Sequence, residues 1–216
     1  GNSQLKLLYG NNFASFPYNS NFETALSNFL KTLSNKNLIF AISSVNPNIF
    51  ETFIHSLADY PNFKYLSVKD LLQSQTLVDF SQVSGTGEDR KMGIIGGLLN
   101  SNPPFVTIDI GTATTINVLN EDKVFQGGAI LPGPITQINS LNQSATALKE
   151  FKLFAPTSII GINTEESINS GIINGTVGAI LFFLDIIQKD ILKIKDFPIY
   201  LTGGSANLLY DKLQKY

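Results

Sequence analysis

The sequence predicts an α/β protein built from two similar halves, and three observations support this prediction. Strand-like apolar runs alternate with amphipathic stretches of helical period along the chain. The segment "SNPP", residues 101–104, interrupts this pattern near the middle. When Gly1 is placed on Gly111, "GNSQLKLLYGNNFASF" lies over "GTATTINVLNEDKVFQ" with the same order of glycine, polar residues, strand, turn and strand. We therefore expect two domains, residues 1–103 and 104–216.

The first half is expected to open with a hairpin and to continue with helices and strands in turn. The expected elements are strands at 3–9 and 12–16, a helix at 21–34, a strand at 37–45, a helix after Pro47, a strand at 63–67 and a helix over 86–99. Thr86 can cap the last of these helices, and the acids Glu88 and Asp89 suit its first turn.

The second half repeats the hairpin and adds longer helices. The expected elements are strands at 105–110, 113–119 and 122–127, a turn "GGAILPGP", helices at 134–148 and 165–189, a strand at 198–202 and a last helix after "TGGSA". Asn163 and Thr164 resemble a helix cap. Residues 167–184 carry no charge, but polar residues and glycines interrupt them, so we expect a buried helix and no membrane span.

Composition narrows the function classes. The chain has 216 residues, 43% of them hydrophobic, and a formal net charge of −2 without a basic run, so we expect no nucleic-acid partner. Cysteine is absent, which excludes disulfides and thiolate metal sites. A single histidine, His55, excludes a multi-histidine metal site and argues against a Ser-His-Asp triad.

The strand that ends in "DIGT", residues 109–112, could hold a charged ligand. Gly111 permits close backbone approach, and Thr112 offers a hydroxyl and a backbone donor. A carboxylate such as Asp109 beside this loop suits a cation that accompanies phosphates. The alternative is that Asp109 and Thr112 satisfy the amides of their own hairpin.

The segment "GTGEDRK", residues 85–91, combines glycines with a possible base and a possible anion binder. Arg90 favours the ionised form of Asp89, and an ionised carboxylate can deprotonate an alcohol that attacks a phosphate. The alternative is an ordinary helix start with acids in its first turn. The glycine turns "GGAILPGP" and "TGGSA" can likewise place a helix N-terminus against a nucleotide, or simply change the chain direction.

These motifs stand in a fixed order with others along nearly the whole chain. They are "GNS" at the start, "ISSVNP" (42–47), "GEDR" (87–90), "DIGTATT" (109–115), "GGAILPGP" (127–134), "GINTEESINSG" (161–171) and "LTGGSA" (201–206). Together they resemble type III pantothenate kinase, a family of the acetate and sugar kinase, heat-shock chaperone and actin superfamily. The resemblance implies two ribonuclease-H-like domains, an actin-like ATPase duplication, flanking a cleft.

The resemblance also implies an activity. It is phosphorylation of pantothenate by ATP to 4'-phosphopantothenate, the first step of coenzyme A biosynthesis. The implied cofactors are ATP, Mg²⁺ and a monovalent cation, K⁺ or NH₄⁺, and the implied state is a cytoplasmic homodimer.

The family's residue roles carry over by motif. Asp89 matches the general base, and Asp109 matches the ligand of the monovalent cation. The matched pantothenate contacts are Gly87, Glu88, Asp89, Arg90, Phe80 and, near the dimer interface, Thr164. The matched ATP contacts are Gly1, Asn2, Ser3 and Thr112.

Three departures from the family pattern leave alternatives open. The family's first loop begins with an Asp two residues before its glycine, and the family continues beyond "TGGSA", so we expect both ends to be trimmed. Phe80 stands where the family usually has a Tyr, so the hydroxyl contact is lost. The alternatives are a non-catalytic accessory or regulatory binding protein and a kinase for another small alcohol.

Overall fold

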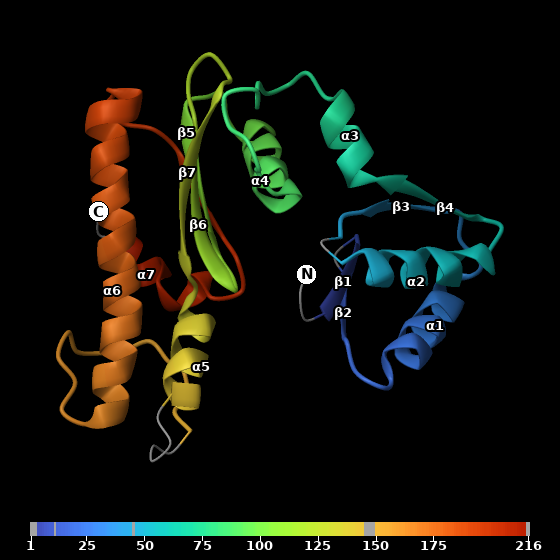
Figure 1. The fold of residues 1–216 in the computed structure, drawn as a ribbon, viewed down its shortest axis with the longest axis horizontal. Helices are drawn as coiled ribbons and strands as arrows, with labels where there is room; N and C mark the ends of the chain where they lie inside the picture. Colours follow the sequence, from blue (N-terminus) through green and yellow to red (C-terminus); the bar gives the residue numbers. More distant parts are fainter. Residues whose placement is uncertain (1–3, 11, 45, 145–149, 215–216) are drawn as a thin grey trace. The chain divides into compact units, whose positions relative to one another are not determined.

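The computed structural model describes residues 4–10, 12–44, 46–144 and 150–214, and its chain forms two compact units, residues 1–75 and 76–216 (Figure 1). The predicted mixed α/β class is confirmed, since helices and strands alternate through both units. The boundary between the units, at residues 75/76, lies before the boundary predicted from the sequence at residues 103/104, because α4 (Glu88–Leu98) packs on the sheet of the second unit. The division into two ribonuclease-H-like domains stays a prediction.

The first unit holds the expected hairpin and a parallel strand pair. Strands β1 (Gln4–Tyr9) and β2 (Asn12–Pro17) pair antiparallel, and β3 (Leu38–Ile42) pairs parallel with β4 (Phe63–Ser67). These strands confirm the expected positions to within a few residues at the ends.

Two amphipathic helices supply the core of the first unit. Helix α1 (Phe22–Leu33) buries Leu26 and Leu30, and α2 (Pro47–Ala58) buries Phe53 and Leu57 in the same cluster. Helix α2 begins where expected because the Asn46 side chain accepts from the backbone N–H groups of Asn48 and Ile49. The short helix α3 (Val68–Ser74) was not predicted, since it has only seven residues and none of its side chains is fully buried.

The second unit is built on a four-stranded sheet in the order β7-β6-β5-β8. Strands β5 (Phe105–Ile110), β6 (Ala113–Leu119) and β7 (Phe125–Pro132) form an antiparallel meander, and β8 (Ile199–Thr202) pairs parallel with β5. Helix α6 (Thr164–Ile186) lies on one side of the sheet and α4 on the other, and α5 (Pro134–Ser144) lies beyond the end of the sheet and contacts α6 (Figure 1).

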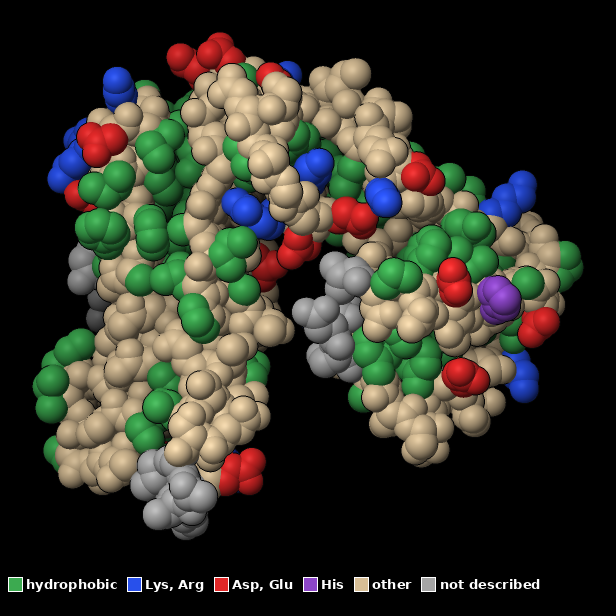
Figure 2. Space-filling model, viewed as in Figure 1, with side chains coloured by type: hydrophobic (Ala, Val, Ile, Leu, Met, Phe, Trp, Pro, Cys, Tyr) green, Lys and Arg blue, Asp and Glu red, His purple; other side chains and the backbone are tan. Residues whose placement is uncertain are grey.

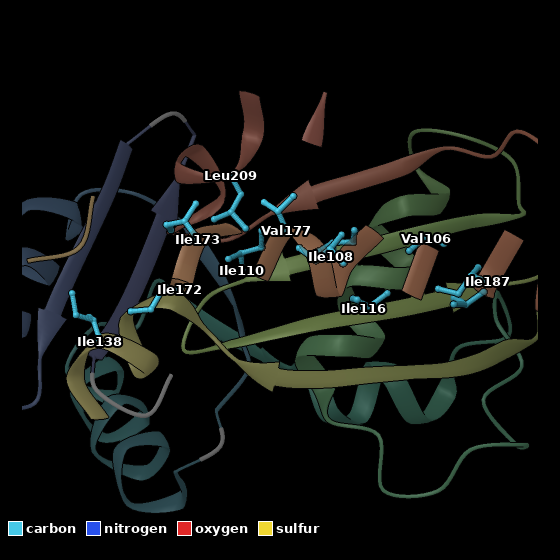
Figure 3. Close-up of a cluster of buried hydrophobic side chains, with 12 residues drawn as sticks. Val106, Ile108, Ile110, Ile116, Ile138, Ile172, Ile173, Val177, Ile187 and Leu209 are labelled. Carbon is cyan, nitrogen blue, oxygen red and sulfur yellow. The ribbon is translucent and has the colours of Figure 1, made fainter. Parts of the chain in front are cut away.

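The main core lies between this sheet and α6. Ile108, Ile110 and Ile116 of the sheet share one buried cluster with residues of the helix, and Figure 3 shows Ile110 beside Ile173 and Val177. A π-helical stretch, η1 (Ile187–Leu192), continues α6, and the chain after β8 forms a 3-10 turn, η2 (Ala206–Leu208), and α7 (Tyr210–Leu213). The expected cap of α6 is confirmed, because Asn163 Oδ1 accepts from the backbone N–H of Glu166 at 2.9 Å.

Two local predictions were wrong. The segment "GGAILP" was expected to be a turn, but β7 runs through it to Pro132. Gly128 makes this pairing possible, since a Cβ there would lie 1.7 Å from the carbonyl oxygen of Ile116. Thr86 was expected to cap α4, but the capping residue is Gly87 and no side chain bonds to that end as a cap.

The apolar stretch of α6 and η1 is the one membrane-span candidate among the described helices. Thr164–Leu192 is long and apolar enough by length and composition, with a mean hydropathy of 1.8 over its best window. A core helix passes the same test, and the buried side chains of α6 pack on the sheet.

Candidate active site

The sheet of the second unit has one apolar and one polar face. Because side chains alternate along a strand, Val106, Ile108 and Ile110 of β5 all enter the core beside α6. The intervening residues Thr107 and Asp109 therefore point to the side that α4 covers. Their paired partners on the neighbouring strands extend this polar face: Asn117 and Tyr200 beside Thr107, and Thr115 and Thr202 beside Asp109.

A pocket of about 300 Å³ lies between this polar face and α4. It brings together three residues that the sequence singled out, Asp89, Arg90 and Asp109. The remaining lining residues are Gly93, Gly96, Gly97, Asn100, Thr107, Thr115, Asn117, Tyr200 and Thr202. A possible base, a possible anion binder and a possible cation ligand thus share one pocket.

Asp89 lies in the first turn of α4, and its carboxylate bonds to that turn. Its Oδ1 accepts from the backbone N–H of Arg90 at 2.8 Å. The positive end of the helix dipole stabilises a carboxylate at this place. Gly87 leaves room for it, since a Cβ on Gly87 would lie 2.5 Å from the same oxygen.

The side chain of Arg90 reaches the sheet. Its Nε donates to Asn117 Oδ1 at 2.5 Å, and its guanidinium carbon lies 5.5 Å from the centroid of the Phe125 ring. Burial lowers the pKa of the Arg90 guanidinium from its ordinary value, and the nearby charge of Asp89 acts in the opposite direction. Arg90 therefore remains a cation held in a partly desolvated place.

Asp109 is the last residue but one of β5 and lies where two loops converge. The backbone N–H of Ser205 in "TGGSA" donates to the carbonyl oxygen of Ile110 at 2.9 Å. On the other side, Thr112 accepts at its carbonyl oxygen from the Gly133 backbone N–H and the Thr136 hydroxyl. The "DIGT" loop thus lies beside the "TGGSA" turn and beside Gly133, which follows β7. It stands at the carboxyl ends of the parallel strands β5 and β8, where α/β sheets bind ligands.

Asp109 could hold a cation at the edge of this pocket. Thr115 and Thr202 pair with it on the neighbouring strands and also line the pocket, and hard cations take oxygen ligands. Among the described residues no group of three or more His, Cys, Asp or Glu side chains is placed to hold a metal. A cation bound here would therefore need further oxygen ligands from water or from a substrate phosphate.

The other predicted site residues lie in several places. Phe80 packs against Phe125 in a tilted arrangement with ring centroids 5.4 Å apart, so it borders the aromatic ring beside Arg90. Glu88 opens α4 beside Asp89, and Thr164 opens α6; neither lines the pocket described above. Gly1, Asn2 and Ser3 lie outside the described residues.

Sequence reasoning singled out neither Thr107 nor Asn117, which complete the pocket together with Thr115. Thr107, Thr115 and Asn117 are buried, with 4%, 9% and 2% of their surface exposed. Their signal is the alternation of polar and apolar residues in "VTID" and "TTINV", since strands with two apolar faces would have none.

Comparison with known proteins decides the family. Residues 1–185 match the model of a protein family described as type III pantothenate kinase. The chain belongs to the type III pantothenate kinase family. The resemblance inferred from the motif series is thereby confirmed.

Several relatives carry that family name. A type III pantothenate kinase from Sulfurihydrogenibium sp. (strain YO3AOP1) is 31% identical over 198 residues, which span 89% of this chain and 75% of the relative. One from Thermosipho africanus (strain TCF52B) is 30% identical over 81% of this chain and 69% of the relative.

A solved structure supports the fold. The crystal structure of a protein described as a conserved Baf family transcriptional activator from Campylobacter jejuni superposes with a TM-score of 0.58. The two chains are 18% identical, and the match spans 98% of this chain and 84% of the other. At this identity the likeness concerns the fold alone.

Proposed function

We propose that this chain transfers the γ-phosphoryl group of ATP to the hydroxyl of pantothenate, giving ADP and 4'-phosphopantothenate, the first step of coenzyme A biosynthesis. The observation that carries the proposal is the shared pocket of Asp89, Arg90 and Asp109 in a member of this family. The proposed location is the cytoplasm, where ATP is at hand as phosphoryl donor.

Asp89 is the proposed general base. As the pantothenate oxygen attacks the γ-phosphorus, the new O–P bond forms, the bond to the leaving ADP oxygen breaks, and the hydroxyl proton passes to the Asp89 carboxylate. The first-turn position of Asp89 supports this role, because the N-terminus of a helix interacts favourably with a negatively charged side chain. Arg90, Gly87 and Glu88 are proposed to bind pantothenate beside it, with Phe80 as an apolar wall.

Asp109, with Thr115 and Thr202, is proposed to hold the monovalent cation, K⁺ or NH₄⁺, and Thr112 to contact the nucleotide. Bound Mg²⁺ and the monovalent cation would offset negative charge on the phosphates. Gly1, Asn2 and Ser3 are proposed to contact the phosphates as well.

We also propose a homodimer formed through α6 and the segment that precedes it. Exposed apolar side chains there include Ile159, Ile160 and Ile162, with 69%, 72% and 91% of their surface exposed. Along α6 a Cβ added at Gly171, Gly175 or Gly178 would meet nothing within 4 Å, so another backbone could approach closely. Figure 2 shows hydrophobic side chains gathered on the part of this unit where Figure 1 places α6. Thr164 lies at the start of this surface, which supports its proposed contact with the partner's substrate.

The test is phosphorylation of pantothenate by Mg-ATP with K⁺ present, on the wild-type chain and on Asp89→Asn. Loss of the base is expected to lower kcat by about 10²–10⁴. Asp79→Asn is the matched control, because Asp79 is an exposed acid of the same unit whose carboxylate bonds only to its own turn at Ser81. Sedimentation of the same samples measures the oligomeric state. Absence of turnover, or an Asp89→Asn variant as active as wild type, would sink the kinase proposal and favour the accessory binding protein.

A further inference from the structure

Arg90 is the only arginine in the chain, and the structure shows how it is held. It projects from the third position of α4, and two contacts within the fold restrain its guanidinium. Nε donates to Asn117 Oδ1, and the guanidinium carbon lies over the Phe125 ring. A long side chain with both restraints loses most of its rotamer freedom before any ligand arrives.

Asn117 is itself held rigidly from the opposite side. Its side chain is 2% exposed, and its Nδ2 donates to the hydroxyls of Thr107 at 3.4 Å and Thr115 at 3.3 Å. These bonds decide the orientation of the amide, since a flipped amide would set its NH₂ group against the N–H of Arg90. The backbone pairing of Asn117 with Thr107 fixes the network to two neighbouring strands.

One donor of the guanidinium is left over. Arg90 Nη2 is buried and has no hydrogen-bond partner among the described residues. A buried donor without a partner is costly, and a ligand acceptor would relieve that cost. Arg90 lines the pocket, so an acceptor entering there could supply the bond.

We propose that Asn117 is a positioning residue for substrate binding: its amide oxygen holds the guanidinium of Arg90 so that the remaining donors meet an anionic or carbonyl oxygen of the substrate. This inference rests on the proposed function for the identity of the substrate. The bond between Asn117 and Arg90, however, can be tested without turnover.

The first experiment follows the Nε–H signal of Arg90 by proton–nitrogen NMR. Because the chain has a single arginine, no other arginine signal overlaps with it. In Asn117→Ala we expect this hydrogen to exchange with water about tenfold faster or more, since a hydrogen bond to a charged group is lost. Asn117→Asp keeps the size of the side chain and an acceptor oxygen, so we expect slow exchange to persist. Unchanged exchange in folded Asn117→Ala would overturn the proposal, and if that variant does not fold, fast exchange in Asn117→Asp overturns it.

The second experiment measures steady-state kinetics with pantothenate. We expect Asn117→Ala to raise KM about tenfold while kcat changes far less, because Asp89 stays in place, and we expect Asn117→Asp to restore KM. Asn120→Ala is the matched control: Asn120 is a partly buried asparagine near the same sheet whose side chain accepts from the Val124 backbone N–H. A wild-type chain without turnover refutes the proposed function, while the NMR result still decides the role of Asn117. Equal changes in KM for Asn117→Ala, Asn117→Asp and Asn120→Ala refute the positioning role.

Discussion

Gly203 is the residue at which a single methyl group should disturb both the fold and Asp109, the proposed cation ligand. Its φ is +103°, a conformation that side chains other than glycine rarely adopt. A Cβ there would lie 2.5 Å from Asp109 Oδ1 and equally close to the backbone N and C of Ile110. The carboxylate could move aside, but the backbone of β5 could not.

The magnitude for Gly203→Ala follows from these two effects. A non-glycine residue in a sparsely populated backbone region costs about 1–3 kcal/mol, and overpacking costs about as much again. The bond from the Ser205 backbone N–H to Ile110 holds the turn against the strand, so the strain cannot be relieved by a free shift. We therefore expect a loss of roughly 2–6 kcal/mol, which for a chain of this size lowers Tm by about 5–20 °C.

Thermal unfolding of Gly203→Ala beside Gly204→Ala tests this reasoning. Gly204 is the adjacent glycine of the same turn, and a Cβ there would meet nothing within 4 Å, so its Tm should stay within a few degrees of wild type. In the Gly203→Ala protein that remains folded, the K⁺ concentration for half-maximal activity should rise because Asp109 is displaced. Equal Tm values for the two variants would show that the close approach of Gly203 to β5 does not affect the stability of the fold.

Two further substitutions test the pocket and the core. In Gly87→Ala the backbone φ of −61° suits alanine, but the new Cβ would displace the Asp89 carboxylate. We therefore expect kcat to fall about 10²-fold with a small change in Tm. Unchanged kcat would count against Asp89 as the base. In Thr114→Val a buried hydroxyl without a partner among the described residues becomes a methyl group. We therefore expect the free energy of unfolding, measured in urea, to stay the same or to rise by up to about 1 kcal/mol. A clear fall would show that the hydroxyl is hydrogen-bonded in solution.

The sequence predicted those elements whose signals are local. The β1–β2 hairpin follows from two short runs around a glycine turn, and the starts of α2 and α6 follow from the capping residues Asn46 and Asn163. The misplaced elements depend on distant partners. Strand β7 continues through Gly128 because the neighbouring strand β6 leaves no room for a side chain there, and no local pattern of β7 shows this.

The candidate site could be predicted only in part for the same reason. Asp89, Arg90 and Asp109 stand in motifs that a reader of the sequence can find. Asn117 stands in no such motif, and its importance comes from its bonds to Arg90 and Thr107, which are 27 and 10 residues away along the chain. The register of β5 against β6 would have been needed to place it.

That register also explains why a buried strand ends on a carboxylate. The isoleucines of β5 and β6 must face α6, and this requirement fixes both strands to within one residue, because a shift by one would turn every side chain to the other face. With Ile108 and Ile110 in the core, Asp109 can only point toward α4, and with Ile116 in the core, Asn117 can only do the same. The hydrophobic core on one face of the sheet therefore determines which polar side chains meet on the other. Substitutions that loosen the core near Ile108 and Ile116 should for this reason disturb the pocket before they unfold the unit.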